Sequence, residues 1–332
     1  MFRWKYFHLK YLAALAATLV AVVPIDVASA QSSPSTSGRQ VRMVVPFPPG
    51  GTADILARIL GEQIGKTGGP TILVENRPGG GTVIATDLVA RAAPDGNTML
   101  MMANSFVINA AVRASLPYDP LTSFEPVCVL VNSPQILVVN ANSPFKTLAD
   151  FVAAAKAKPG ELNYATVGPA TTQHIAVEAF LRAADIKLTY VPFGGGAPAT
   201  NALLGGHVMA VLANPSEVLE QVNAGKLRAL AVASRERFAL LPNTPTIMES
   251  GYKDFEATAW FGLVVPAKTP KETVAQHIAT FKAALAAPDV QSKLIAQGYS
   301  TIGICGEDFA AHLKRQHADY VRVAKEANIK VE

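Results

Sequence analysis

The chain has 332 residues, of which 50% are apolar and 16% charged, with a formal net charge of +4. This length is enough for two domains, and the composition is that of a well-packed globular protein, not of a disordered one. No cluster of lysines and arginines is present, which excludes a nucleic-acid-binding surface.

The first thirty residues have the three parts of a secretory signal. Arg3, Lys5 and Lys10 give a positive start, an apolar run extends to about Pro24, and Ala28-Ser29-Ala30 matches a signal-peptidase site. The run is shorter than the roughly 20 apolar residues that a spanning helix needs. We therefore expect a signal peptide at residues 1–30, cleaved after Ala30, and a secreted chain.

The loss of residues 1–30 removes three cations and one anion, so the net charge falls from +4 to +2. No cysteine follows the apolar run, which argues against a lipid anchor. Residues 31–39 are polar and rich in serine, and are expected to form a flexible lead-in.

From residue 40 onward, short apolar runs alternate with helical patterns. The expected strands are 43–45, 71–74, 99–102, 136–139, 163–166, 188–191, 208–212, 229–233 and 260–265. Helices are expected to begin at Thr52, after Ser105 and after Gly196, to cover 82–91, 147–156 and 172–183, and to fill the chain from Pro270 onward. This alternation predicts an α/β fold with mainly parallel sheets.

Two turns between a strand and a helix have the composition of an anion site: Pro49-Gly50-Gly51-Thr52 and Gly168-Pro169-Ala170-Thr171-Thr172. In α/β sheets ligands bind at the carboxyl ends of strands, where helix N-termini present unpaired N–H groups. Two such turns that face each other can hold a carboxylate without an arginine. The alternative is that they only make turns and cap helices, with Thr52 as the N-cap of its helix and Asp54 favoured by the helix dipole.

Enzyme motifs are absent from the sequence. It contains no complete phosphate-binding loop, no G-x-S-x-G and no H-E-x-x-H. His174 is the one histidine beside a candidate turn, and a lone histidine there is more often structural. We therefore predict no catalytic residue, no metal site and no cofactor.

Two cysteines, Cys128 and Cys305, remain in an oxidising compartment after export. There a pair of cysteines is more often a disulfide than a metal site. The sequence leaves open whether the two meet in space.

Several motifs, in order along the chain, resemble the Bug family, the substrate-binding proteins of tripartite tricarboxylate transporters. They are Val45–Arg58 (VPFPPGGTADILAR), Val74–Gly81 (VENRPGGG), Ala93–Thr98 (APDGNT), Leu116–Pro120 (LPYDP), Tyr190–Gly196 (YVPFGGG), Ala224–Ala231 (AGKLRALA) and Phe261–Pro266 (FGLVVP). The resemblance spans nearly the whole chain after the signal.

The resemblance implies a two-lobed periplasmic binding protein of the type II-like fold, with lobe 1 at 40–127 plus 258–332 and lobe 2 at 128–257. It implies a monomer that binds a small carboxylate, a di- or tricarboxylic or aromatic acid, and delivers it to integral membrane transporter subunits. By position, the implied ligand-binding residues are Pro48, Gly50, Thr52, Asp54, Asn104, Ser105, Gly168, Thr171, Thr172, His174, Phe193, Gly194 and Asn214.

Two other functions stay open at this point. One is a sensor that presents its ligand to a membrane signalling partner. The other is an enzyme that acts on a carboxylate through His174 and Asp54. Asn214 stands where family members often have an acidic residue, which argues against a ligand with an amine.

Overall fold

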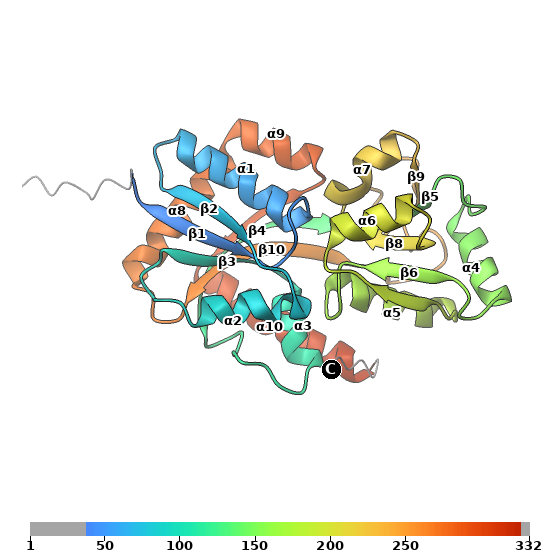
Figure 1. Cartoon of the computed structure of the whole chain (residues 1–332), viewed down its shortest axis with the longest axis horizontal. Helices are drawn as coiled ribbons and strands as arrows, with labels where there is room; N and C mark the ends of the chain where they lie inside the picture. The colour runs from blue at the N-terminus through green and yellow to red at the C-terminus, as the bar shows by residue number, and fades with distance from the viewer. Residues whose placement is uncertain (1–37, 327–332) are drawn as a thin grey trace, which may run out of the picture. The chain divides into compact units, whose positions relative to one another are not determined.

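The computed structural model describes residues 38–326, which form two mixed β-sheets with helices on both faces of each (Figure 1). The predicted signal peptide and most of the lead-in lie outside the described residues. The six-stranded sheet has the order β11-β4-β10-β3-β1-β2, with β1 Gln40–Val45, β2 Thr71–Asn76, β3 Thr98–Ala103, β4 Phe124–Pro134, β10 Thr258–Pro266 and β11 Ser300–Cys305. The five-stranded sheet has the order β7-β6-β8-β5-β9, with β5 Ile136–Asn140, β6 Asn163–Thr166, β7 Thr189–Pro192, β8 Ala210–Ala213 and β9 Leu227–Val232.

The six-stranded sheet is covered on both faces because successive side chains of a strand point to opposite sides. Met43 and Val45 of β1 pack toward one set of helices, α1 Thr52–Lys66, α8 Lys271–Ala286 and α9 Pro288–Ala296. Val44 packs toward the other set, α2 Val83–Ala90, α3 Ser105–Val112 and α10 Glu307–Glu326, with the short η1 Gly80–Thr82 before α2. Figure 1 shows α1 and α9 above the strands and α2, α3 and α10 below them.

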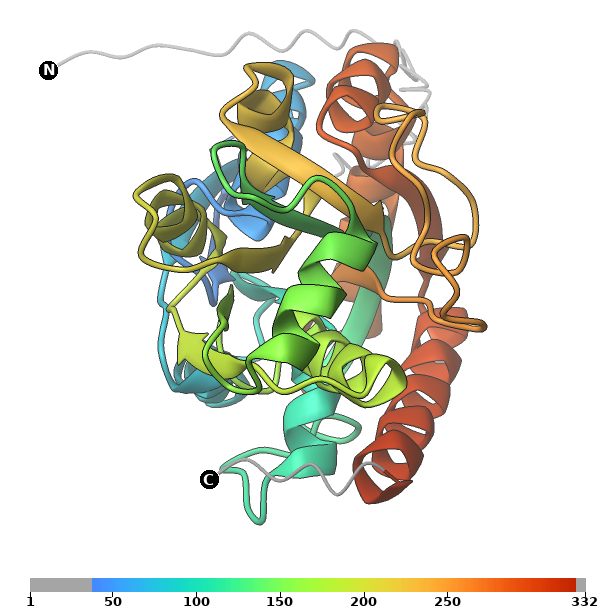
Figure 2. The ribbon, with the colours of Figure 1, turned by 90° about the vertical axis from the view of Figure 1, so that its right-hand side faces the viewer.

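The five-stranded sheet is built in the same way. Leu137 and Val139 of β5 pack against α4 Leu148–Ala157 and α5 Thr172–Ala184. Ile136 and Val138 pack against α6 Gly196–Leu204 and α7 Pro215–Asn223. Figure 2 shows the two pairs of helices on opposite sides of this sheet.

The predicted two-lobed α/β fold is confirmed, but three of its details are wrong: the direction of the strands, the C-terminal part and the absence of β4 and α7 from the prediction. The sheets are mixed, since β4, β10 and β11 in one sheet and β5 and β9 in the other pair antiparallel with their neighbours. The chain after Pro270 is not all helical, because β11 lies between α9 and α10. Every residue of β11 is at least partly exposed, so this edge strand lacks the buried apolar run by which strands are predicted. β4 and α7 were not predicted either, although β4 contains the apolar run Val127–Val131.

A disulfide joins Cys128 of β4 to Cys305 of β11, with an S–S distance of 1.99 Å. The two residues are opposite each other in the antiparallel ladder, and 177 positions apart in sequence. The bond therefore fastens the edge strand and the helix that follows it to the centre of the sheet.

The chain passes between the two sheets at Gln135 and returns at Ala257, where Gln135 N donates to Ala257 O over 3.2 Å. β4 stays in the six-stranded sheet as far as Pro134, immediately before this passage. The residue limits of the two lobes as folding units stay a prediction.

A buried histidine ties α8 to the turn before β3. His277 is only 5% exposed, and its Nε2 lies 2.9 Å from Gly96 O. Burial lowers the pKa of His277, and the positive charge of nearby Arg39 lowers it further. The hydrogen bond to Gly96 opposes this shift but does not cancel it. We therefore expect the ring to be neutral in the folded protein at neutral pH.

Acidification should destabilise the protein through this group. The unfolded chain has the ordinary histidine pKa of about 6.5. Between that value and the lower folded pKa, the unfolded state binds more protons, so the free energy of unfolding should fall as pH decreases through about 6.5 and below. Urea titrations at about pH 7.5 and about pH 5.5 should show this loss, and His277→Gln should reduce its size. A pH dependence that is identical in the variant would contradict the assignment to His277.

No helix in the described part of the chain, residues 38–326, has the length and apolar character needed to cross a bilayer. The same residues contain no group of three or more histidine, cysteine or acidic side chains placed to hold a metal ion.

Candidate functional site

The first predicted turn, between β1 and α1, contacts the lobe of the five-stranded sheet. Thr52 Oγ1 donates to Glu217 Oε1 over 2.9 Å and lies 2.9 Å from Ser216 Oγ, both at the start of α7. A carbon added at Gly195, before α6, would lie 2.4 Å from Pro48 Cδ. The two lobes are thus closed onto each other at this turn.

The prediction that Thr52 is the N-cap is wrong. Gly51 is the N-cap of α1 and Thr52 is the first helical residue. The Thr52 side chain donates to Glu217 instead of capping its own helix. The residues around Thr52 in the sequence do not predict this contact.

Asp54 holds the first turn in shape. Its Oδ2 accepts from Gly50 N over 2.9 Å, and its Oδ1 forms an ion pair of 2.9 Å with Arg58. Burial raises the pKa of Asp54, but the hydrogen bonds from Arg58 and Gly50 outweigh this effect and the pKa lies below its ordinary value. Both oxygens of this ionised carboxylate are therefore already used within the turn.

The second predicted turn, between β6 and α5, is also tightly organised. Thr171 is the N-cap of α5: its Oγ1 donates to Gly168 O over 2.7 Å and accepts from His174 N over 3.4 Å. Ala170 has a φ of 53°, in the left-handed region that a non-glycine residue rarely adopts. Ala170 is fully buried in an apolar cluster with α3 of the other lobe. Strained backbone of this kind concentrates at functional sites.

The second turn leaves donors free, as the start of α1 does at Ala53 and Asp54, whose N–H groups have no partner within residues 38–326. The N–H groups of Thr172 and Gln173, in the first turn of α5, have no hydrogen-bond partner within residues 38–326. Thr172 and Asn104 also line an open cavity of about 500 Å³ between the lobes. Its other lining residues are Asn132, Ile175, Ala176, Ala179, Asp254, Phe255, Glu256, Ala257, Thr258, Trp260, Ile302, His312, Gln316, Tyr320 and Val323.

His174 packs against Tyr190, with ring centroids 4.7 Å apart and planes at 28°. Its Nδ1 is buried and has no partner among the described residues. Burial lowers the pKa of His174. The charge of Glu178 acts in the opposite direction but is the smaller effect. The ring is therefore a neutral, stacked group that keeps one polar atom available.

The side chains of Asn104 and Ser105 form their hydrogen bonds mainly within the six-stranded lobe. Asn104 Oδ1 accepts from Trp260 N over 2.8 Å, and its Nδ2 donates to Tyr320 OH over 2.9 Å. Ser105 Oγ accepts from Thr82 Oγ1 over 3.4 Å. Both side chains are buried, so they tie β3 and α3 to their neighbours.

Phe193 and Asn214 lie beside these turns, on the five-stranded lobe. Phe193 is partly buried, and its carbonyl oxygen would lie 3.3 Å from a carbon added at Gly168; Gly194, next to it, is exposed. Asn214 is buried, and its Oδ1 accepts from Gln135 Nε2 over 2.7 Å. The residues predicted from the two turns therefore gather where the lobes meet.

Glu217 contacts the first turn but was not among the predicted site residues. It sits at the third position of α7, where Asn214-Pro215-Ser216-Glu217 has the spacing of a capping box. Burial raises the pKa of Glu217, although hydrogen bonds from Thr52 and Asn214 oppose the shift. The capping-box spacing could have identified Glu217, but not its contact with Thr52, because 165 residues separate the two.

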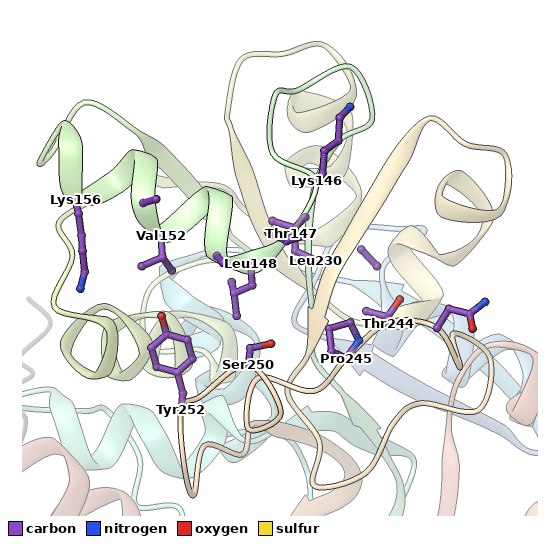
Figure 3. Close-up of a pocket in the computed structure, with 14 residues that line it drawn as sticks. Lys146, Thr147, Leu148, Val152, Lys156, Leu230, Thr244, Pro245, Ser250 and Tyr252 are labelled. Atoms are coloured by element: carbon purple, nitrogen blue, oxygen red, sulfur yellow. The ribbon is translucent and has the colours of Figure 1, made fainter.

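A second cavity, of about 660 Å³, lies on the five-stranded lobe between α4 and the segment 243–252 (Figure 3). Leu148, Val152 and Leu230 are among its apolar lining residues, and Lys146 and Lys156 also line it. None of the predicted ligand-binding residues is part of it.

Two α/β lobes joined where the chain passes twice between the sheets, with helix N-termini at their junction, have the architecture of a periplasmic solute-binding protein. Residues 56–329 match the family model described as "Tripartite tricarboxylate transporter family receptor". The chain belongs to this family.

Two relatives support the assignment over most of their length. The chain is 35% identical to "UPF0065 protein in tcbD-tcbE intergenic region" of Pseudomonas sp. (strain P51), over 86% of each chain. It is 34% identical to "Protein BugT" of Bordetella pertussis (strain Tohama I / ATCC BAA-589 / NCTC 13251), over 86% of this chain and 89% of the relative.

Solved structures of similar proteins have the same fold. The periplasmic binding protein BugD is 33% identical, with a TM-score of 0.86 over 89% of this chain and 99% of its own. R. palustris Rpa4515 with adipate is 33% identical, with a TM-score of 0.85 over 88% and 98%. MatC from Rhodopseudomonas palustris with bound malate is 30% identical, with a TM-score of 0.81 over 86% and 99%.

Proposed function

We propose that this protein is a periplasmic receptor that captures a small carboxylate between its lobes and delivers it to membrane subunits of a tripartite tricarboxylate transporter. The observation that carries the proposal is the pair of N–H groups at the start of α5, from Thr172 and Gln173, that have no hydrogen-bond partner within residues 38–326. Unpaired N–H groups and the helix dipole make such a position favourable for an anion. The adipate and malate bound by two relatives support the ligand class.

The mechanism that we propose is closure of the lobes on the ligand. A carboxylate held at the second turn would meet the other lobe only when the lobes are closed, so binding would favour that state. The contacts of Thr52 with Ser216 and Glu217, and of Ala170 with α3, are the closed-state contacts that support this.

We infer a binding role and not catalysis. In the enzyme alternative Asp54 would need a free carboxylate oxygen, but Gly50 and Arg58 occupy both. His174 is stacked on Tyr190, and its pKa is lowered by burial, which is compatible with a neutral group that lines a binding site.

The Thr172→Val variant tests the site. Valine keeps the shape of the side chain but removes the hydroxyl, so the affinity for a bound carboxylate should fall about 10-fold, or about 1.4 kcal/mol. A thermal-shift screen of a carboxylate library would identify a ligand for calorimetry, since a bound ligand raises the melting temperature.

Thr280→Val is the matched control, because Thr280 lies on α8 and donates only to Gln276 O of its own helix. Equal affinities of the two variants would remove Thr172 from the site. A library in which no carboxylate changes the melting temperature would refute the ligand class.

A further inference from the structure

The cavity between α4 and the segment 243–252, here named the α4 cavity, is formed by the five-stranded lobe alone (Figure 3). Its lining residues within the described chain come from α4 and the two residues before it, from β9, and from the segment 243–252. Its volume of about 660 Å³ lies within the range of roughly 300–1,000 Å³ that small-molecule sites occupy. The shape of this cavity therefore does not depend on closure of the lobes.

The floor of the α4 cavity is apolar. Leu148 and Val152 of α4 and Leu230 of β9 line it and are also buried members of the lobe core. Tyr252 packs against the same core and meets Phe180 edge to face, with ring centroids 5.0 Å apart. Because these side chains are held by core packing, the floor is a fixed surface that favours the apolar body of a ligand.

The rim of the α4 cavity is positively charged. Lys146 and Lys156 line it and are exposed, and its lining residues in the described chain include no aspartate or glutamate. The charge of Lys146 acts on Asp150, whose carboxylate accepts from the N–H groups of Lys146 and Thr147. The ammonium of Lys156, in contrast, forms no hydrogen bond or ion pair with another residue of 38–326. The uncompensated charge of this cavity is therefore at Lys156.

A second polar group lies near Lys156. Figure 3 shows the hydroxyl of Tyr252 turned toward α4, on the same side of the cavity as Lys156. This hydroxyl has no hydrogen-bond partner among residues 38–326. Burial raises the pKa of Tyr252, so the hydroxyl keeps its proton at neutral pH. An ammonium and a phenolic O–H at one side of an apolar floor are two donors for an anionic group.

We propose that the α4 cavity is a second ligand-binding site, for a small amphipathic anion with an apolar body and one carboxylate or sulfonate end. The body lies on the floor of Leu148, Val152 and Leu230, and the anionic end faces Lys156 and Tyr252. A cationic ligand is disfavoured because both charged lining residues are lysines. This site is separate from the residues between the lobes, so the inference goes beyond the proposed receptor function.

The test uses two fluorescent probes that differ by one anionic group: anilinonaphthalene sulfonate (ANS) and its uncharged analogue phenylnaphthylamine. Fluorescence titrations of the exported and purified protein give both affinities for the wild type and for variants of the cavity. Lys156→Met keeps most of the aliphatic stem and removes the charge, so the affinity for ANS should fall about 3- to 5-fold. The affinity for phenylnaphthylamine should not change. Lys187→Met is the matched control, since Lys187 is an exposed lysine of the same lobe outside the cavity.

Two further variants test the hydroxyl and the space. Tyr252→Phe keeps the ring and removes the O–H donor, so it should weaken ANS about 5-fold. Ala153→Phe places a ring in the cavity from an exposed position of α4, so it should weaken both probes at least about 10-fold. Ala157→Phe is its control, because Ala157 is exposed on the same helix but does not line the cavity. Unchanged melting temperatures would show that the variants are folded.

Wild-type affinity for ANS in Ala153→Phe and Lys156→Met would overturn the proposal, as would a wild type that does not bind ANS. An equal loss of both probes in Lys156→Met would overturn the anionic class of ligand. A loss of ANS in Thr172→Val that Ala153→Phe does not show would place the probe between the lobes and overturn the second site. Capture of a carboxylate between the lobes is tested separately by the thermal-shift screen, so the two proposals can fail independently.

Discussion

The Gly195→Val variant is expected to bind ligand at least about 10-fold more weakly than the wild type, because it cannot reach the closed arrangement. A carbon at this position would lie 2.4 Å from Cδ and 2.9 Å from Cγ of Pro48, well inside the contact distance of two carbons. The proline ring is rigid and belongs to the other lobe, so the clash can be relieved only by separating the lobes.

The substitution should leave each lobe folded. Gly195 has a φ of 168° and a ψ of 176°, an extended conformation that valine adopts without strain. The melting temperature without ligand should therefore change little, while small-angle scattering should no longer show compaction on addition of ligand. Gly65→Val in α1 is the matched control, since a carbon added there meets nothing within 4 Å. Wild-type affinity in Gly195→Val would show that ligand does not need this closed state.

The second large effect is expected from loss of the disulfide. The Cys128→Ala/Cys305→Ala double variant should lose about 2–5 kcal/mol of unfolding free energy, because the bond closes a long loop in the unfolded chain. The native state is also affected, since β11 pairs with the sheet only through β4 and has no fully buried residue. Urea titration of both proteins measures the difference.

A thiol reductant provides the control for this prediction. It should lower the stability of the wild type to that of the double variant, and it should leave the double variant unchanged. Equal stabilities of the oxidised wild type and the double variant would show that the bond contributes nothing. The expected loss would then have to be attributed to other contacts of β11, such as the pairing of Thr301 with Val131.

Much of the fold is readable from the sequence because its signals are local. Val44 and Val45 before a Pro-Gly turn predict a buried strand and its end, and Thr147 with Asp150 makes the capping box that starts α4 where a helix was expected. The resemblance to the Bug family predicted the two lobes, which the fold confirms. β4, α7 and β11 were missed. For β11 the reason is that its attachment depends on a partner strand and a disulfide far away in sequence.

The candidate site was predicted only in part, for the same reason. The two glycine- and threonine-rich turns are present at the starts of α1 and α5. The sequence presented them as equivalent, whereas in the structure the N–H group of Thr52 donates to Glu217 and the N–H group of Thr172 has no partner within residues 38–326. Which donors are free depends on what faces them across the lobes.

The sequence by itself therefore determined most of the strands and helices, the positions of the two candidate turns and the family of the protein. Hydrophobic periodicity, turn residues and helix starts are set by neighbours in the chain, so the order of residues encodes them directly. Only the tertiary structure decided that the sheets are mixed, that Cys128 meets Cys305 and that Glu217 accepts a hydrogen bond from Thr52. These features depend on contacts between residues 165 or more positions apart, or on strand pairing, and local sequence preference does not specify them.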